Sequence, residues 1–381
     1  MAIGLADILE AVDPSGFDLS CSQQKAWRAI VSCRTEKLGG HVECCDHCGA
    51  LRQVYHSCRN RHCPRCQTRA KEAWLAARRR ELLPVPYFHL VFTLPHKFNA
   101  MASDLRLLYE LLFGSVSQTL NEFAANPRWL GGTPAFSLVL HTWKQDLGRH
   151  LHVHALMAGG ALTATGEWIA TKQGYLFPVQ ALSTVFRGKF MGALDEARKA
   201  GRIRHEMARI DRQWRAFRDS LYLHDWVVYA KAPLGGPAQV LEYLGRYTHR
   251  VAICNDRILG MEHGMVRFRM RDSANGNRKK LVRMEAREFA RRFLLHVLPG
   301  GFKRIRHYGL LGPAHKAEKL AAARAALSAP APDPLVTEPV EAFLLRVAGI
   351  EWMACPHCGT GHFHVLSPIE HTAIPGNHGP P

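Results

Sequence analysis

Three histidines alternate with apolar residues in the segment His150-Leu-His152-Val-His154. Side chains on a β-strand point alternately to its two faces, so the three imidazoles are expected on one face. Two neutral imidazoles about 7 Å apart along a strand can bind one divalent metal ion between them. The pattern therefore predicts a metal site at His152 and His154. Its third ligand is expected from Gln145, close before this strand, or from His150.

Two tyrosines, Tyr243 and Tyr247, lie four residues apart in a segment expected to be helical, residues 237–250. This spacing places both phenols on the same helix face, one turn apart. A phenol can serve as the nucleophile of a covalent reaction when a metal or base activates it. Nearby donors for phosphate oxygens are Arg246, His249 and Arg250. The same spacing also fits an ordinary helix face buried in a core, which is the structural alternative.

Eight of the 11 cysteines lie between Cys21 and Cys66, a clustering that indicates metal binding rather than disulfides in a reducing cytosol. Two C-x-x-C pairs stand out, and four thiolates suit a structural zinc ion bound tetrahedrally. The expected ligands of this zinc ion are Cys45, Cys48, Cys63 and Cys66. A second zinc ion could use the nearby donors Cys33, His41, Cys58 and His62. Alternatively, these two further cysteines are merely small buried residues.

A third C-x-x-C pair, Cys355 and Cys358, lies in the C-terminal tail and is followed by His362 and His364. The pair could form a further zinc knuckle completed by these histidines. The alternative is a disordered tail.

The charge of the chain indicates a polyanionic partner. It carries 50 Lys and Arg against 32 Asp and Glu, a formal net charge of +18. With 47% hydrophobic residues it can still build folded cores, which excludes a disordered polycation. When Lys and Arg bind the phosphates of a nucleic acid, counterions are released and association is favoured. Nucleic acid is therefore expected as the partner before a membrane surface. Because the sequence has neither a long apolar run nor a leader pattern, we expect a cytoplasmic, nucleoid-associated protein.

Strands and helices must position these groups. Strands are expected at residues 88–95, 136–143, 150–157 and 224–232, and helices at 67–83, 100–123, 179–220 and 237–250. The connection between residues 143 and 150 is too short for a parallel crossover. The sequence therefore predicts an α+β fold with a central antiparallel sheet flanked by helices. The expected domains are a helical and zinc-binding module at 1–70, a catalytic domain at 84–312, and an Ala/Pro linker with a tail at 313–381.

At these motifs the chain resembles the transposases of the insertion-sequence 91 family, which belong to the HUH superfamily of single-strand nucleases. The resemblance covers residues 33–364. Its carriers are SCRNRHCPRCQ at 57–67, FTLP at 92–95, HTWKQDLGRHLHVH at 141–154, YLGRYTHRVAI at 243–253 and FKRIRHYGLL at 302–311.

The resemblance implies an HUH-type sheet that carries His152 and His154 beside a helix presenting Tyr243 and Tyr247. It also implies catalytic Mg²⁺ or Mn²⁺, structural Zn²⁺, single-stranded DNA as substrate, and a 5′-phosphotyrosine intermediate in rolling-circle-like transposition. Arginines stand where related initiators commonly carry a lysine near the tyrosine. Other readings are a plasmid replication initiator or relaxase with the same chemistry, or a non-catalytic zinc-dependent DNA-binding regulator. The oligomeric state does not follow from the sequence.

Overall fold

The computed structural model describes residues 3–172, 174–234, 239–240, 245, 252–272, 276, 278–334 and 338–372. The chain divides into two compact units. Unit 1 comprises Met1–Ala73, His249–Val297 and Pro334–Pro381, and unit 2 comprises Trp74–Thr248 and Leu298–Asp333. Residues 249–297, expected in the catalytic domain, thus belong to the unit that holds the N-terminal module.

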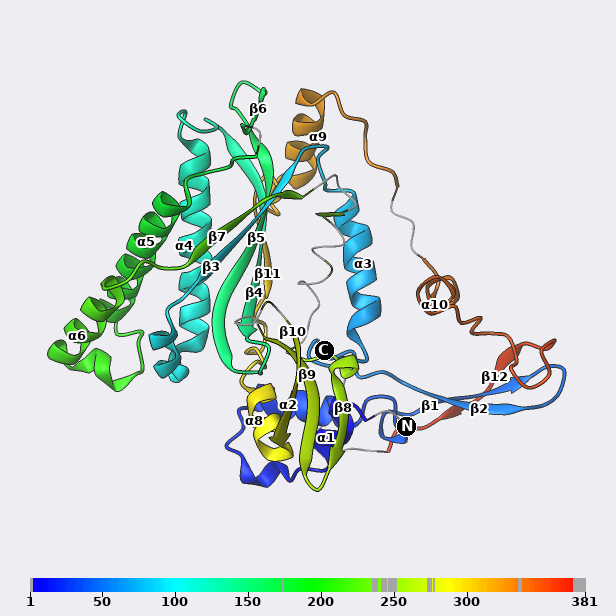
Figure 1. The fold of residues 1–381 in the computed structure, drawn as a ribbon. Helices are drawn as coiled ribbons and strands as arrows, with labels where there is room; N and C mark the ends of the chain where they lie inside the picture. Colours follow the sequence, from blue (N-terminus) through cyan, green and yellow to red (C-terminus); the bar gives the residue numbers. More distant parts are fainter. Residues whose placement is uncertain are drawn as a thin grey trace. The chain divides into compact units, whose positions relative to one another are not determined.

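Unit 2 is built around a six-stranded antiparallel sheet with the order β11-β4-β5-β3-β7, and β6 pairs with β5 (Figure 1). The strands are β3 (Tyr87–Thr93), β4 (Thr133–Trp143), β5 (Arg149–Leu162), β6 (Trp168–Ala170), β7 (Val228–Leu234) and β11 (Ile305–Gly309). The helices are α4 (Leu105–Ala125), α5 (Val179–Lys199), α6 (Asp211–Tyr222) and α9 (Lys316–Ala326). The prediction of an α+β fold with a central antiparallel sheet is confirmed.

One face of this sheet packs against α4 and α5 in the main hydrophobic core (Figure 1). Alternate residues of the central strands point into this core, including Phe92 of β3, Leu140 of β4, and Leu151 and Val153 of β5. All four are buried to 2% exposure or less. Because strand side chains alternate, the intervening residues of β5, which include the three histidines, must face the opposite side.

The opposite face is covered along part of its length by a second apolar cluster. Leu156 and Ala158 of β5 pack there with Leu320 and Ala323 of α9. This finding corrects the linker prediction, because the Ala-rich residues up to Ala326 form a packed helix rather than a spacer. Further toward the start of β5, the same face carries His154, His152 and His150 in place of the aliphatic side chains.

Unit 1 contains two three-stranded antiparallel sheets, β12-β1-β2 and β10-β9-β8. The strands are β1 (Gly40–Cys45), β2 (Leu51–Tyr55), β8 (Ile258–Glu262), β9 (Met265–Asp272), β10 (Arg278–Glu285) and β12 (Phe363–Ile369). The helices are α1 (Leu5–Glu10), α2 (Cys21–Val31), α8 (Ala286–Leu294) and α10 (Val340–Ala348). Phe268 of β9 and Phe289 of α8 are fully buried, with ring centroids 5.5 Å apart.

Helix α3 (Gln67–Arg79) spans the boundary between the units, and its Trp74 and Leu75 pack against the second apolar cluster of unit 2. Most expected strands and helices are observed with ends shifted by a few residues, but the helical segment expected at 179–220 forms two helices, α5 and α6, with a short 3-10 turn at Glu206–Arg209 between them. The expected helix at 237–250 lies largely outside the described residues. Among the described residues, no helix is long and apolar enough to cross a membrane.

Candidate functional site

Three imidazoles meet on one face of the central sheet. His141 on β4 pairs directly with His152 on β5, and His154 is the next residue on the same face of β5. The ring centroids of His141 lie 5.5 Å from His152 and 4.4 Å from His154. One nitrogen from each ring lies within 4.8 Å of the others, a spacing that suits common ligation of one metal ion. The pairing of two antiparallel strands therefore brings together three nitrogen donors, one from β4 and two from β5.

Hydrogen bonds fix the orientation of the two β5 histidines. Nδ1 of His152 donates to the backbone oxygen of His150 at 3.0 Å, since a carbonyl oxygen can only accept. The lone pair of His152 therefore lies on Nε2. Nδ1 of His154 lies 2.8 Å from Nε2 of His89, on β3. A hydrogen bond to the second ring nitrogen is the usual support of a histidine that binds metal through the first.

Burial keeps the imidazoles of His152 and His89 neutral. Burial, and then the nearby His150, lowers the pKa of His152 to about 3. Burial, and then the positive charge of Lys231, lowers the pKa of His89 to about 4. Both rings are therefore uncharged at neutral pH, which is the form that binds metal.

The third donor of this group is His141, which sequence reasoning missed. A signal existed, because a tight connection between two antiparallel strands sets residues at similar distances from the turn opposite each other. Gln145 lies within the connection between β4 and β5, where the Lys144 N–H donates to the Gly148 oxygen at 2.8 Å. The ring of His150 lies 4.9 Å from that of His152, but His150 is outside the three-histidine group.

The predicted nucleophiles and phosphate donors lie outside the described residues. These are Tyr243, Tyr247, Arg246, His249 and Arg250. Val240 of the same segment is described: it is fully buried in the second apolar cluster, together with Leu156 and Ala158 of β5. Position 240 is thus packed on the sheet face that also carries the histidines.

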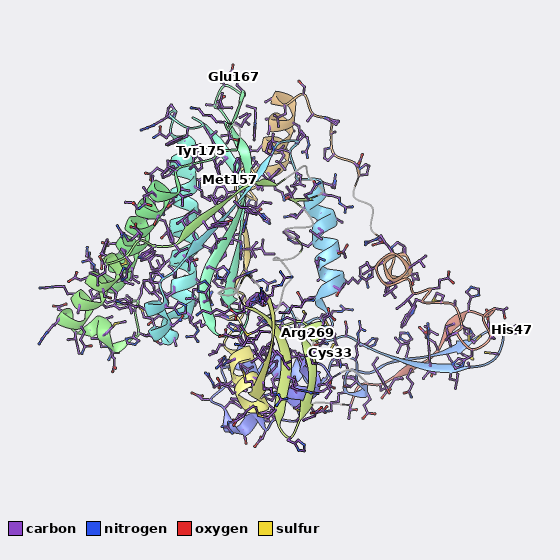
Figure 2. All side chains as sticks on the ribbon, in the orientation of Figure 1. Cys33, His47, Met157, Glu167, Tyr175 and Arg269 are labelled. Atoms are coloured by element: carbon purple, nitrogen blue, oxygen red, sulfur yellow. The ribbon has the colours of Figure 1, made fainter. Side chains whose placement is uncertain are left out.

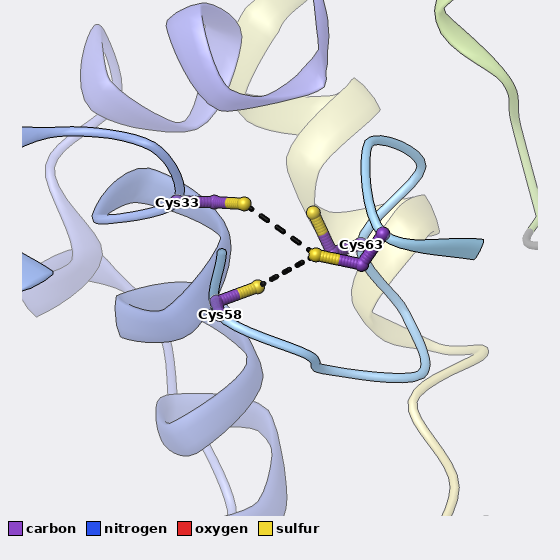
Figure 3. A group of neighbouring side chains, drawn as sticks. Cys33, Cys58 and Cys63 are labelled. Atoms are coloured by element: carbon purple, nitrogen blue, oxygen red, sulfur yellow. Dashed lines mark hydrogen bonds between the residues drawn. The ribbon is translucent and has the colours of Figure 1, made fainter. Parts of the chain in front are cut away.

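The first cysteine cluster lies in unit 1. Its four thiols belong to Cys33, Cys58, Cys63 and Cys66. Sγ of Cys66 lies 3.6 Å from Sγ of both Cys33 and Cys58. The sulfurs of Cys33, Cys58 and Cys63 point toward one another (Figure 3). A zinc ion bound by four thiolates at about 2.3 Å separates its ligands by about 3.8 Å, so this cluster fits a closed structural zinc site.

The predicted zinc ligand set of Cys45, Cys48, Cys63 and Cys66 is wrong. The structure instead groups Cys45 and Cys48 with Cys355 and Cys358. The second predicted set is wrong in the same way, since its two cysteines complete the first cluster. The two histidines of that set are not members of either cluster. Nε2 of His41 lies 2.9 Å from Oε1 of Glu43 instead. The C-x-x-C spacing identifies half-sites, whereas strand pairing decides which halves meet.

Two family models and two curated relatives match this chain. A family model described as "Putative transposase" matches residues 135–319, and one described as "Transposase zinc-binding domain" matches residues 8–94. The chain is 43% identical over 381 residues to "Putative transposase y4qJ" of Sinorhizobium fredii, covering 98% of this chain and 94% of that one. It is 26% identical over 290 residues to "Transposase for insertion sequence element IS801" of Pseudomonas savastanoi pv. phaseolicola, covering 74% of this chain and 68% of that one. No solved structure matches significantly. The chain thus belongs to the insertion-sequence 91 family of transposases and carries the family's N-terminal zinc-binding domain.

Proposed function

We propose that this transposase cleaves and rejoins single-stranded DNA through a 5′-phosphotyrosine intermediate, in rolling-circle-like transposition. The observation that carries the proposal is the three-histidine group on one face of the central sheet, formed by His141, His152 and His154. It lies on the sheet face against which Val240 packs, three residues before Tyr243 in the sequence.

The donor set fits a divalent metal ion. Three imidazoles from two strands offer three nitrogen ligands, fewer than the six of an octahedral ion, so oxygen ligands from substrate and water would complete its coordination. Nitrogen donors suit transition metals better than Mg²⁺, so of the two ions expected from the sequence we favour Mn²⁺. When bound, such an ion supplies Lewis-acid polarisation of a phosphoryl oxygen.

The protein supplies the nucleophile. An unperturbed tyrosine has a pKa of about 10, so its phenol must lose its proton before or during attack. The phenolate oxygen of Tyr243 or Tyr247 forms a bond to the scissile phosphorus. The bond from phosphorus to the 3′ oxygen breaks, which leaves a free 3′ hydroxyl after protonation and a 5′-phosphotyrosine. Attack of another 3′ hydroxyl on this ester reverses the step and joins strands without ATP. In this scheme, Arg246, His249 and Arg250 would neutralise phosphate charge.

A basic sheet face in unit 1 supports a nucleic-acid substrate. Strands β9 and β10 pair Arg271 with Lys279 and Arg267 with Arg283, and Arg269, labelled in Figure 2, lies on the same face of β9 as Arg267 and Arg271. Since Arg267 also forms an ion pair with Glu262 at 2.6 Å, the pair of Arg271 and Lys279 carries the argument. Cationic side chains directly opposite each other destabilise a sheet unless an anion separates their charges. A DNA backbone supplies anions at such spacing.

A covalent-adduct assay tests the proposal. The full-length protein is incubated with Mn²⁺ and a labelled single-stranded oligonucleotide that carries a transposon end, and is then denatured. We expect a labelled protein band, with the label on a peptide that contains residue 243 or 247 by mass spectrometry. The matched control is the Tyr243→Phe/Tyr247→Phe variant, which should give no adduct. An adduct that persists in this variant would show that another residue attacks.

A further inference from the structure

The two cysteine pairs of the second cluster have the same local sequence. Cys45-Asp-His-Cys48-Gly49 near the N-terminus and Cys355-Pro-His-Cys358-Gly359 near the C-terminus both follow the pattern C-x-H-C-G. Of the four cysteines, two lie beyond residue 94, where the match to the zinc-binding domain ends. The cluster is therefore separate from the first one, which lies wholly within that domain.

The backbone of the two pairs is also the same. The Gly49 N–H donates to the Cys45 oxygen at 3.1 Å, and the Gly359 N–H donates to the Cys355 oxygen at 2.9 Å. The two glycines have φ values of +70° and +72°, a conformation that L side chains rarely adopt. Each turn directs both sulfurs of its pair to one side. Two such turns facing each other form the arrangement of a zinc ribbon.

The sulfur positions match the coordination shell of one ion. Sγ of Cys45 lies 3.7 Å from Sγ of Cys358, and Sγ of Cys48 lies 3.7 Å from Sγ of Cys355. All four sulfurs lie within 4.8 Å of one another. A tetrahedral zinc ion with Zn–S bonds of about 2.3 Å requires edges of about 3.8 Å. The distances therefore fit a closed four-thiolate site.

Strand pairing brings the two halves together. Strand β12 runs antiparallel to β1, with Cys45 opposite Phe363. The backbones also meet at the turn, where the Asp46 N–H donates to the His362 oxygen at 3.0 Å and the His362 N–H donates to the Asp46 carboxylate at 2.7 Å. His47, inside the first turn, lies at the far end of the ribbon from Cys33 of the first cluster (Figure 2). The two clusters are thus at separate places in unit 1.

The apolar core at this end of the ribbon is very small. Its buried members are Cys45, Cys355 and Phe363. Arg52 of β2 covers this core, since its guanidinium lies 3.9 Å from the ring centroid of Phe363 and 4.3 Å from that of Trp352. A hydrophobic core of this size does not stabilise a folded structure without a further crosslink. A metal ion provides one.

We propose that Cys45, Cys48, Cys355 and Cys358 bind a second structural zinc ion, which fastens the C-terminal segment to the β1–β2 hairpin. Binding converts the four thiols to thiolates and releases their protons, without any redox change. The Gly361 N–H donates to Sγ of Cys358 at 3.3 Å and so stabilises the charge of that thiolate. His362 and His364, the completing ligands considered from the sequence, are not members of this group, since two cysteines from the N-terminal module fill their places.

Zinc content of the purified full-length protein tests this proposal. Mass spectrometry of the metal should give two zinc ions per chain under reducing conditions. The Cys355→Ser/Cys358→Ser variant should retain one, and so should Cys58→Ser/Cys63→Ser, which disrupts the first cluster. The matched control is Cys44→Ser, which removes the neighbouring thiol on β1 that belongs to neither cluster and should leave two. One zinc ion in the wild-type protein, or two in Cys355→Ser/Cys358→Ser, would overturn the proposal.

A Co²⁺ titration of the wild-type protein tests the second metal site even if a variant fails to fold. Added to the zinc-free protein, Co²⁺ should saturate at two equivalents, both with the intense absorption of tetrahedral four-thiolate coordination. Saturation at one equivalent would contradict the second site. Neither readout involves DNA cleavage, so failure of this proposal is distinguishable from failure of the proposed function.

Discussion

Nε2 of His89 lies 2.8 Å from Nδ1 of His154, across the pair of strands β3 and β5. His89 is itself buried, at 5% exposure. If His154 binds metal through Nε2, its Nδ1 carries the proton and donates to His89. The contact therefore orients one ligand of the proposed metal site from a neighbouring strand.

We expect His89→Ala to weaken Mn²⁺ binding by about 10- to 100-fold, the usual effect of losing the partner of a metal-bound histidine. Calorimetric titration of the full-length protein with Mn²⁺ measures this. His89→Gln, whose amide oxygen can accept the same hydrogen bond, should recover part of the affinity. Equal losses in the two variants would mean that His89 acts by packing alone.

His141 is expected to be the third ligand of the metal site, ahead of Gln145 and His150. His141→Ala should therefore reduce both Mn²⁺ affinity and adduct formation by about 100-fold or more, whereas Gln145→Ala and His150→Ala should have smaller effects. The same titration and the adduct assay compare the three variants. The assignment fails if Gln145→Ala proves the most damaging.

The paired tyrosines are expected to have separable roles. Each single variant, Tyr243→Phe or Tyr247→Phe, removes one oxygen nucleophile and leaves the ring in place. If one tyrosine makes the first cut, only its variant should lose the first adduct, by about 1000-fold or more, because an oxygen nucleophile cannot be replaced by a ring hydrogen. Gel quantification of the adduct and of strand-transfer product distinguishes the two steps. Full activity in both single variants would show that either tyrosine can perform the first step.

Acid should destabilise unit 2 through His307. Its Nε2 accepts from Arg78 at 2.9 Å, so its Nδ1 carries the proton and donates to the Ser137 hydroxyl at 2.7 Å. Burial, and then the charges of Arg78 and Lys316, lowers the pKa of His307 from 6.5 to about 4. The unfolded chain therefore binds a proton first, and stability present above pH 6.5 should fall as the pH drops toward 4.

Urea denaturation at several pH values between 7 and 4 measures this dependence. Other buried histidines with lowered pKa contribute in the same direction, so the informative quantity is the difference from His307→Gln. This variant keeps polar groups beside Arg78 and Ser137 but cannot titrate in this range. A shallower dependence of the unfolding free energy on pH is expected, and an unchanged slope would rule out His307 as a contributor.

The basic face of β9 and β10 should bind DNA without sequence preference. Replacement of Arg269 or Lys279 by alanine should weaken binding to different single-stranded sequences about equally. Each should also reduce the slope of log affinity against log salt concentration by about 0.7, the value for one lost phosphate contact on a single strand. Fluorescence anisotropy at several salt concentrations provides the measurement. A variant that discriminates among sequences would indicate contacts to bases instead.

The sequence alone determined the features that arise from local pattern. Alternation of apolar and polar residues in β5 was enough to place Leu151 and Val153 in the core and the histidines on the other face, because a strand has a fixed period of two. The short connection before β5 was enough to predict an antiparallel sheet. The C-x-x-C spacing identified zinc knuckles, since two thiols at that spacing can bind the same ion.

Only the tertiary structure decided which distant residues meet. Any C-x-x-C pair can complete any other, and the pairing of β12 with β1 brings Cys355 and Cys358 to Cys45 and Cys48. In the same way, the register of β4 against β5 sets His141 opposite His152. Both outcomes depend on strand register between segments that are separate in the sequence, and register is set by the packing of whole sheets rather than by the residues that it brings together.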